Sequence, residues 1–225
     1  MTNRASGSTL DQPLGMQNIE PIAETRVDSP RLELSDGRRG EIMQVPRWRE
    51  EDRSVATITC ACGAVSIEAV GAPLMCVICN CESCRTAGRE LDSRSPVAPI
   101  VDASGGTAVV LWRKDQLKCV RGSDKWAAHR LSPGSPSRRM FTSCCGTPIF
   151  GDFTKGFWAS IYRDRIPDAP KPSMRVMMSD APDDVALPDD GLPRFRNRPG
   201  KFLLKLLTTW ASMGFRTPKI AGVPD

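Results

Sequence analysis

Histidine is scarce in this chain, since His129 is the only one among 225 residues. A zinc site with several protein ligands must therefore be built almost entirely from cysteine sulfur. Aromatic residues make up only 6% of the chain, and no stretch of basic and aromatic side chains stands out. That composition disfavours a nucleic-acid partner, and the net charge of +5 is too small to argue for one.

Long apolar runs are absent as well. No run of about 18 apolar residues exists, so no segment is expected to span a membrane. The first residues, MTNRASGSTLDQPLG, lack the apolar centre of a secretory leader. We therefore expect a cytoplasmic, reducing location, where clustered cysteines serve as metal ligands or redox thiols.

Cysteine, in contrast, is abundant, and the count of nine is odd, which argues against a fully paired disulfide framework. Cys79, Cys81 and Cys84 fall within one short segment. We expect these thiolates to bind zinc and to leave the fourth position open for water or substrate, as catalytic zinc sites do. Cys76 either closes this site or packs inward from a strand, and we favour the strand. The C-x-x-C pair within the group leaves a redox dithiol as an alternative.

Two further cysteine pairs lie far apart in the sequence. Cys60 and Cys62 form one, Cys144 and Cys145 form the other, and each pair is followed by a glycine that permits a tight turn. Bringing the two turns together would create a four-sulfur structural zinc site that staples the ends of the sheet. Adjacent cysteines rarely bind one ion easily, so Cys145 is the safer ligand of its pair. Cys119 lies in a strand pattern and is expected in the core.

Short β-branched segments separated by glycine and proline predict a mainly β domain of antiparallel strands over residues 54–195. Residues 1–53 are polar and are expected to form a disordered or loosely docked arm. The strands are expected within 54–60, 64–70, 73–79, 106–112, 117–122, 125–131, 138–150, 156–162 and 174–179, with a cysteine loop after 79.

Residues 196–225 have a different character. Between Pro199-Gly200 and Gly214, apolar residues recur at spacings of three and four, which predicts an amphipathic helix. We expect it to pack on its own sheet or on a second subunit in a homo-oligomer. Few cations flank it, so contact with a membrane surface is less favoured. The apolar positions are Phe202, Leu203, Leu206, Leu207, Trp210 and Met213.

Three motifs together resemble the glutathione-dependent formaldehyde-activating enzymes, which share their domain with centromere protein V. They are C-A-C-G-A-V at 60–65, C-N-C-E-S-C-R-T-A-G at 79–88 and C-G-T-P-I-F at 145–150. The resemblance implies curled antiparallel sheets with two zinc sites. By analogy it places Cys60, Cys62 and Cys145 on the structural site and Cys79, Cys81 and Cys84 on the catalytic site.

The chain also departs from that family. Thr142 stands where the last motif usually begins with cysteine, and Asn80 replaces a histidine. The N-terminal arm and the C-terminal helix lie outside the family pattern.

These features favour a zinc-dependent carbon–sulfur lyase or synthase that acts on a glutathione-type thiol and a small aldehyde such as formaldehyde. It would hold one or two zinc ions, and Arg85, with Arg89 and Arg94, would meet the carboxylates of the substrate. One alternative is a non-catalytic, zinc-stapled module that binds a protein, a membrane surface or a nucleic acid. Another is a thiol redox protein.

Overall fold

The computed structural model describes residues 55–182 and 185–224, over which the fold is mainly β with two sheets. The expected N-terminal arm, residues 1–53, lies outside the described residues. One sheet has three antiparallel strands in the order β1-β2-β5. Its strands are β1 (Val55–Thr59), β2 (Ser66–Val70) and β5 (Leu117–Arg121).

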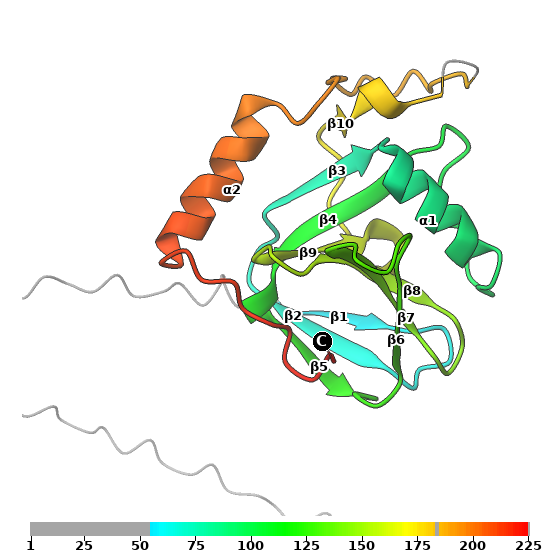
Figure 1. Cartoon of the computed structure of the whole chain (residues 1–225), viewed down its shortest axis with the longest axis vertical. Helices are drawn as coiled ribbons and strands as arrows, with labels where there is room; N and C mark the ends of the chain where they lie inside the picture. Colours follow the sequence, from blue (N-terminus) through cyan, green and yellow to red (C-terminus); the bar gives the residue numbers. More distant parts are fainter. Residues whose placement is uncertain (1–54, 183–184, 225) are drawn as a thin grey trace, which may run out of the picture. The chain divides into compact units, whose positions relative to one another are not determined.

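The other sheet has seven strands in the order β10-β3-β4-β9-β8-β7-β6 (Figure 1). Its pairings are antiparallel except for the short β10, which runs parallel to β3. The expectation of antiparallel β structure is thus confirmed, although only two residues of the segment 174–179 join the sheet. The strands are β3 (Met75–Cys79), β4 (Thr107–Arg113), β6 (Trp126–His129), β7 (Ser137–Thr142), β8 (Pro148–Phe153), β9 (Trp158–Tyr162) and β10 (Arg175–Val176).

Helix α1 (Glu82–Asp92) was not predicted, and the expectation of a cysteine loop after β3 is wrong at this point. The helix begins directly after Cys81, whose sulfur accepts a hydrogen bond from a backbone amide of the first turn. Gly88 lies mid-helix because a Cβ there would come within 2.3 Å of the Val101 side chain. A close approach to the neighbouring loop therefore outweighs the poor helix propensity of glycine.

Helix α2 (Gly200–Ser212) confirms the predicted C-terminal helix. It ends before Gly214, whose φ of +65° is a conformation that glycine adopts without strain. Both flanks of α2 are tied to the sheets. The Phe195 amide donates to the Arg175 carbonyl of β10 (2.9 Å), and the Cys119 amide of β5 donates to the Ala221 carbonyl (2.8 Å).

Two apolar clusters lie on opposite faces of the seven-stranded sheet. Side chains alternate along β4, so that Val110 joins the cluster shared with the three-stranded sheet while Val109 joins the other. The cluster that contains Val109 also contains Leu91 of α1 and Phe202 and Leu206 of α2. The amphipathic helix therefore packs on its own sheet, and burial of each such large side chain contributes about 1.5–3 kcal/mol.

Candidate metal centres and the adjoining cavity

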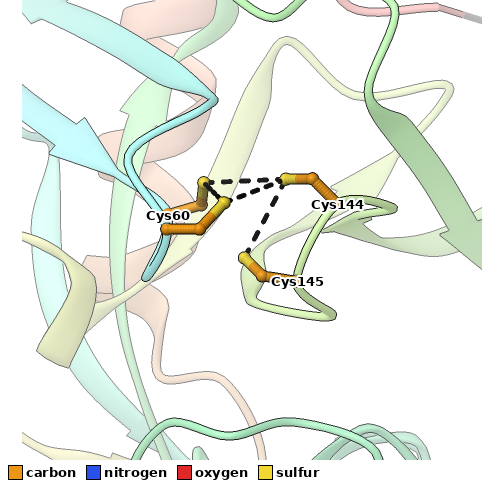
Figure 2. A group of neighbouring side chains, drawn as sticks. Cys60, Cys144 and Cys145 are labelled. Atoms are coloured by element: carbon orange, nitrogen blue, oxygen red, sulfur yellow. Dashed lines mark hydrogen bonds between the residues drawn. The ribbon is translucent and has the colours of Figure 1, made fainter.

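Four cysteines meet between the β1–β2 turn and the β7–β8 turn. Figure 2 shows Cys60 facing Cys144 and Cys145 across the gap between these turns. The Cys60 sulfur lies 3.6 Å from that of Cys62 and 3.9 Å from that of Cys144. The Cys144 sulfur is also 3.4 Å from Cys62 and 3.9 Å from Cys145. The structure thus brings Cys144 into the group as fully as Cys145.

This group joins the two sheets to each other, and not the ends of one sheet as the sequence suggested. Cys60 and Cys62 follow a strand of the three-stranded sheet, whereas Cys144 and Cys145 follow a strand of the seven-stranded sheet. An ion held here would therefore connect both layers.

The tight β1–β2 and β7–β8 turns orient these sulfurs toward one another. Gly63 has a φ of +74° and Gly146 a φ of +70°, values that favour glycine because it lacks a Cβ. The Gly63 amide donates to the Cys60 carbonyl at 2.9 Å, and the Val65 amide donates to the Cys60 sulfur at 3.2 Å. An amide that points at sulfur stabilises the thiolate that a metal requires.

Two threonines lie against the sulfur of Cys145. The hydroxyls of Thr142 and Thr147 are 3.3 Å and 3.0 Å from it. Burial alone would raise the pKa of Cys145, but these hydroxyls and backbone amides outweigh it and lower that pKa to about 5. The hydroxyl of Thr142 thus contacts the sulfur of a candidate ligand, Cys145.

A second group forms where β3 passes into α1. Cys79 is the last residue of β3, Cys81 caps α1, and Cys84 lies in its first turn. The Cys79 sulfur is 3.4 Å from that of Cys81 and 3.7 Å from that of Cys84. The Asn80 amide donates to the Val176 carbonyl at 3.0 Å, which fixes the backbone at this junction.

Cys81 is the thiol of this group whose pKa is lowered. Hydrogen bonds from the thiols of Cys79 and Cys84, the Cys84 amide and the nearby Arg139 charge lower the pKa of Cys81 to about 2. Hydrogen bonding with Cys81 raises the pKa of Cys79 to about 11, and the two other thiols with burial raise that of Cys84. A thiolate at a helix N-terminus also gains from the helix dipole.

Two arginines hold the backbone around the three sulfurs. Buried Arg139 of β7 donates through Nη2 to the carbonyl oxygen and the hydroxyl of Ser83, at 3.0 Å and 2.6 Å. Arg85 donates through Nη1 to the carbonyl oxygens of Asn80 (3.2 Å) and Asp180 (2.9 Å). The structure therefore places Arg85, expected at the substrate, on main-chain oxygens.

A cavity of about 480 Å³ opens beside Cys79, Cys81 and Cys84, and Arg85 is not part of its lining. The hydroxyl of Thr107 lines it, is buried, and has no hydrogen-bond partner in the described part of the chain. Its other side chains come from β3, α1, β4, β7, β8, β9, β10, α2 and the segment before α2. The apolar ones are Val77, Val109, Leu111, Phe153, Trp158, Val176, Phe202, Leu203 and Leu206.

Sequence reasoning missed the cavity residues that carry hydroxyls. Thr107 is the register partner of Cys79 on the neighbouring strand, and Tyr162 is the partner of Val109. Burial raises the pKa of Tyr162, so the phenol keeps its proton at neutral pH. Only strand pairing, which the local sequence does not reveal, could have pointed to them.

Two remaining cysteines belong to the core. Cys76 packs in the cluster between the sheets, on the opposite face of β3 from Cys79, as its strand pattern suggested. Cys119 is buried in the same cluster and donates its thiol proton to the Arg121 carbonyl at 3.1 Å. None of the nine cysteines forms a disulfide.

Both groups could hold a metal ion, because the ligand sulfurs within each lie within 4.8 Å of one another. Tetrahedral zinc, with sulfurs at about 2.3 Å, requires sulfurs roughly 3.8 Å apart. The observed separations of 3.4–3.9 Å match this spacing, whereas a disulfide requires about 2.05 Å. The donor sets therefore fit a thiophilic divalent ion.

None of the helices in the described ranges is long and apolar enough to cross a membrane.

Comparison with protein-family models gives no match, and comparison with curated proteins gives none. Among solved structures, the chain is similar to a crystal structure of a Rhodobacter sphaeroides protein, at 17% identity and a TM-score of 0.36. That similarity covers 62% of this chain and 98% of the other. It is too weak to identify the family that the cysteine motifs resemble.

Proposed function

We propose that the chain is a zinc-dependent carbon–sulfur lyase or synthase that joins a thiol to a small aldehyde. The proposal rests on a difference between the two cysteine groups. The four-cysteine group offers a full tetrahedral set of sulfurs, whereas the three-cysteine group offers one fewer and borders a cavity. A site with three protein ligands and an adjoining cavity leaves a position for substrate, as catalytic zinc sites do.

The chemistry needs no redox partner. Zinc held by Cys79, Cys81 and Cys84 would lower the pKa of an incoming thiol to the neutral range. The thiolate sulfur forms a bond to the carbonyl carbon of the aldehyde, and the π electron pair moves to the oxygen. That oxygen takes up one proton, which balances the proton that the thiol released on forming the thiolate, and the reverse reaction releases thiol and aldehyde.

Tyr162 is the proton donor in this scheme. Its phenol lines the cavity and carries its proton at neutral pH, as phenols with an ordinary pKa near 10 do. The buried hydroxyl of Thr107, which has no partner among the described residues, offers a second hydrogen bond to the developing alkoxide. A positioned general acid contributes about 10²–10⁴-fold to rate.

Three arginines line the cavity, and only one of them is exposed. Arg139 holds Ser83 in the first turn of α1, and Arg138 pairs with Asp152 at 2.7 Å. Arg198 is exposed on the lining, so we assign it, in place of Arg85, to a carboxylate of the substrate. The reaction needs reduced thiols, which suits the cytoplasm.

The proposal is tested by ¹³C exchange spectroscopy on zinc-loaded protein with labelled formaldehyde and a thiol. The wild-type chain should accelerate exchange between free aldehyde and thiol adduct over zinc-containing buffer. Tyr162→Phe should lower that acceleration by about 10²-fold or more, Cys81→Ser should abolish it, and Thr86→Ser should leave it unchanged. The proposal fails if the wild-type chain accelerates exchange with neither glutathione nor 2-phenylethanethiol.

A second candidate is a non-catalytic module in which the zinc is only structural and α2 binds a second copy of the chain. It is favoured by Leu207 and Phe215, which are 54% and 58% exposed. Analytical ultracentrifugation of the double variant Leu207→Ser/Phe215→Ser tests it. A wild-type dimer that becomes a monomer supports this function, and a monomeric wild type excludes it.

A further inference from the structure

We propose that the cavity beside the three-cysteine group accepts a thiol whose body is apolar, and that α2 sets this preference. The inference rests on the function proposed above and names its substrate class. It differs from the glutathione-type substrate that the cysteine motifs suggested.

The polarity of the lining changes along the paired strands β3 and β4. Cys79 lies opposite Thr107, and the next pair on the same face is Val77 with Val109. Leu111 follows on β4, facing the same cavity. At about 3.3 Å per residue, this row extends roughly 13 Å from the threonine to the leucine. A ligand whose sulfur lies at the cysteine end therefore places its remaining atoms against aliphatic side chains.

Helix α2 adds to the apolar part of the lining. Phe202 and Leu206 are buried against the sheet, and Leu203 borders the cavity while remaining 52% exposed. Phe153 and Trp158, whose rings pack 6.2 Å apart, contribute from β8 and β9. The resemblance to the glutathione-dependent enzymes covers roughly residues 57–195, so α2 lies outside it.

Desolvation decides between the two classes of thiol. A glutathione-type tripeptide carries two carboxylates, an ammonium and two amides. Arg198 could pair with one carboxylate, but the groups that lie against the aliphatic and aromatic part of the lining lose water without gaining partners. An apolar thiol instead gains free energy in proportion to the area that it buries. The cavity of about 480 Å³ is within the usual range for a small organic ligand.

Isothermal titration calorimetry on the zinc-loaded full chain tests the inference with 2-phenylethanethiol and glutathione as probes. The tryptophan fluorescence of the chain, to which Trp158 of the cavity lining contributes as one of five tryptophans, gives a second readout. We expect 2-phenylethanethiol to bind at least tenfold more tightly than glutathione. We expect 2-phenylethanol, which has the same body without sulfur, to bind more weakly than the thiol.

Two neighbouring leucines of α2 form a matched pair of sites. Leu203 and Leu204 are both more than half exposed, but only Leu203 borders the cavity. Leu203→Ser should weaken binding of 2-phenylethanethiol about three- to tenfold, whereas Leu204→Ser should leave it unchanged. Both variants change a surface position of the same helix, so folding defects should affect them equally.

The results separate the two proposals. If glutathione binds more tightly than 2-phenylethanethiol and its adduct exchanges on the protein, the substrate class is wrong and the proposed reaction stands. If the two leucine variants weaken binding equally, α2 does not set the preference. If neither thiol binds, both the substrate class and the reaction are overturned.

Discussion

The sulfurs of Cys62 and Cys144 lie 3.4 Å apart although 82 positions separate them in the chain. One belongs to a turn of the three-stranded sheet and the other to a turn of the seven-stranded sheet. An ion held by this group would join the two sheets at this edge of the core between them, in addition to the apolar contacts of Cys60 and Cys145. Stability of the whole domain should therefore depend on this group.

Cys144→Ser should lower the Tm of the metal-loaded protein by about 5–10 °C, because each kcal/mol lost shifts Tm by about 2–4 °C in a domain of this size. The cause is loss of one of four ligands that join the sheets. Ser143→Ala, at the exposed neighbouring position of the same turn, is the matched control and should leave Tm unchanged. Differential scanning calorimetry measures both, and equal Tm values for Cys144→Ser and wild type would contradict the structural role.

Metal stoichiometry should be two ions per chain by native mass spectrometry. Cys81→Ser should reduce it to one by disrupting the three-cysteine group, and Cys145→Ser should reduce it to one through the other group. Cys119→Ala, which changes a core cysteine outside both groups, should retain two. A wild-type chain with no bound ion under reducing conditions would refute both candidate centres.

Arg139→Gln should weaken metal binding at the three-cysteine group by about tenfold, as loss of supporting hydrogen bonds around metal ligands commonly does. The guanidinium holds Ser83, between two ligand positions, through two hydrogen bonds. Ser83→Ala removes only the hydrogen bond to the hydroxyl and should lower the metal affinity less than Arg139→Gln does. Competition with a chelator measures the affinity. Arg130→Gln is the control, and an equal loss in that variant would count against positioning by Arg139.

Tyr162 should make the protein less stable at alkaline pH. Its pKa is raised by burial, whereas the unfolded phenol ionises near pH 10. Above that pH the folded state holds a proton that the unfolded state has released, so stability present below pH 10 is lost as the pH rises. Between pH 8 and pH 10.5 the drop in unfolding free energy should be about 0.8 kcal/mol smaller for Tyr162→Phe. Urea titrations at the two pH values measure the unfolding free energy. An identical decrease in the wild type and in Tyr162→Phe would disprove the claim that burial raises the pKa of Tyr162.

A buried ion cluster beside the cavity should contribute strongly to stability. Asp152 is 2.7 Å from both Lys114 and Arg138, and all three side chains are buried. Asp152→Asn leaves two buried cations without a counter-charge and should cost about 3–5 kcal/mol. Asp115→Asn, in the more exposed pair with Arg113, should cost less than about 1 kcal/mol. Chemical denaturation compares them, and similar costs would argue that the cluster is solvated.

Much of the fold could be predicted from local patterns, because alternation and helical periodicity reflect which face of an element is buried. The spacing at Cys79, Cys81 and Cys84 likewise predicted their convergence, since only a short segment separates them. Helix α1 was not predicted because Gly88 and its polar neighbours lower the helix propensity of the segment. The helix packs against Val101, which belongs to a later loop.

The cavity could not be predicted for the same reason. Thr107 and Tyr162 reach it through strand register, and Leu203 reaches it through docking of α2 on a sheet. The position of Cys144 also depends on pairing between distant turns. Contacts of this kind are set by tertiary packing, which a single sequence does not display.

The segments on both sides of α2 are bonded to different sheets, through Arg175 on one side and Cys119 on the other. A helix restrained at both ends cannot swing open as a hinged flap. Passage of a ligand past it must come from small sideways shifts, or from fraying of the final residues off β5. Truncation after Arg216 would release one of these two restraints and leave every cysteine in place, but it would also remove buried Ile220 from the core between the sheets.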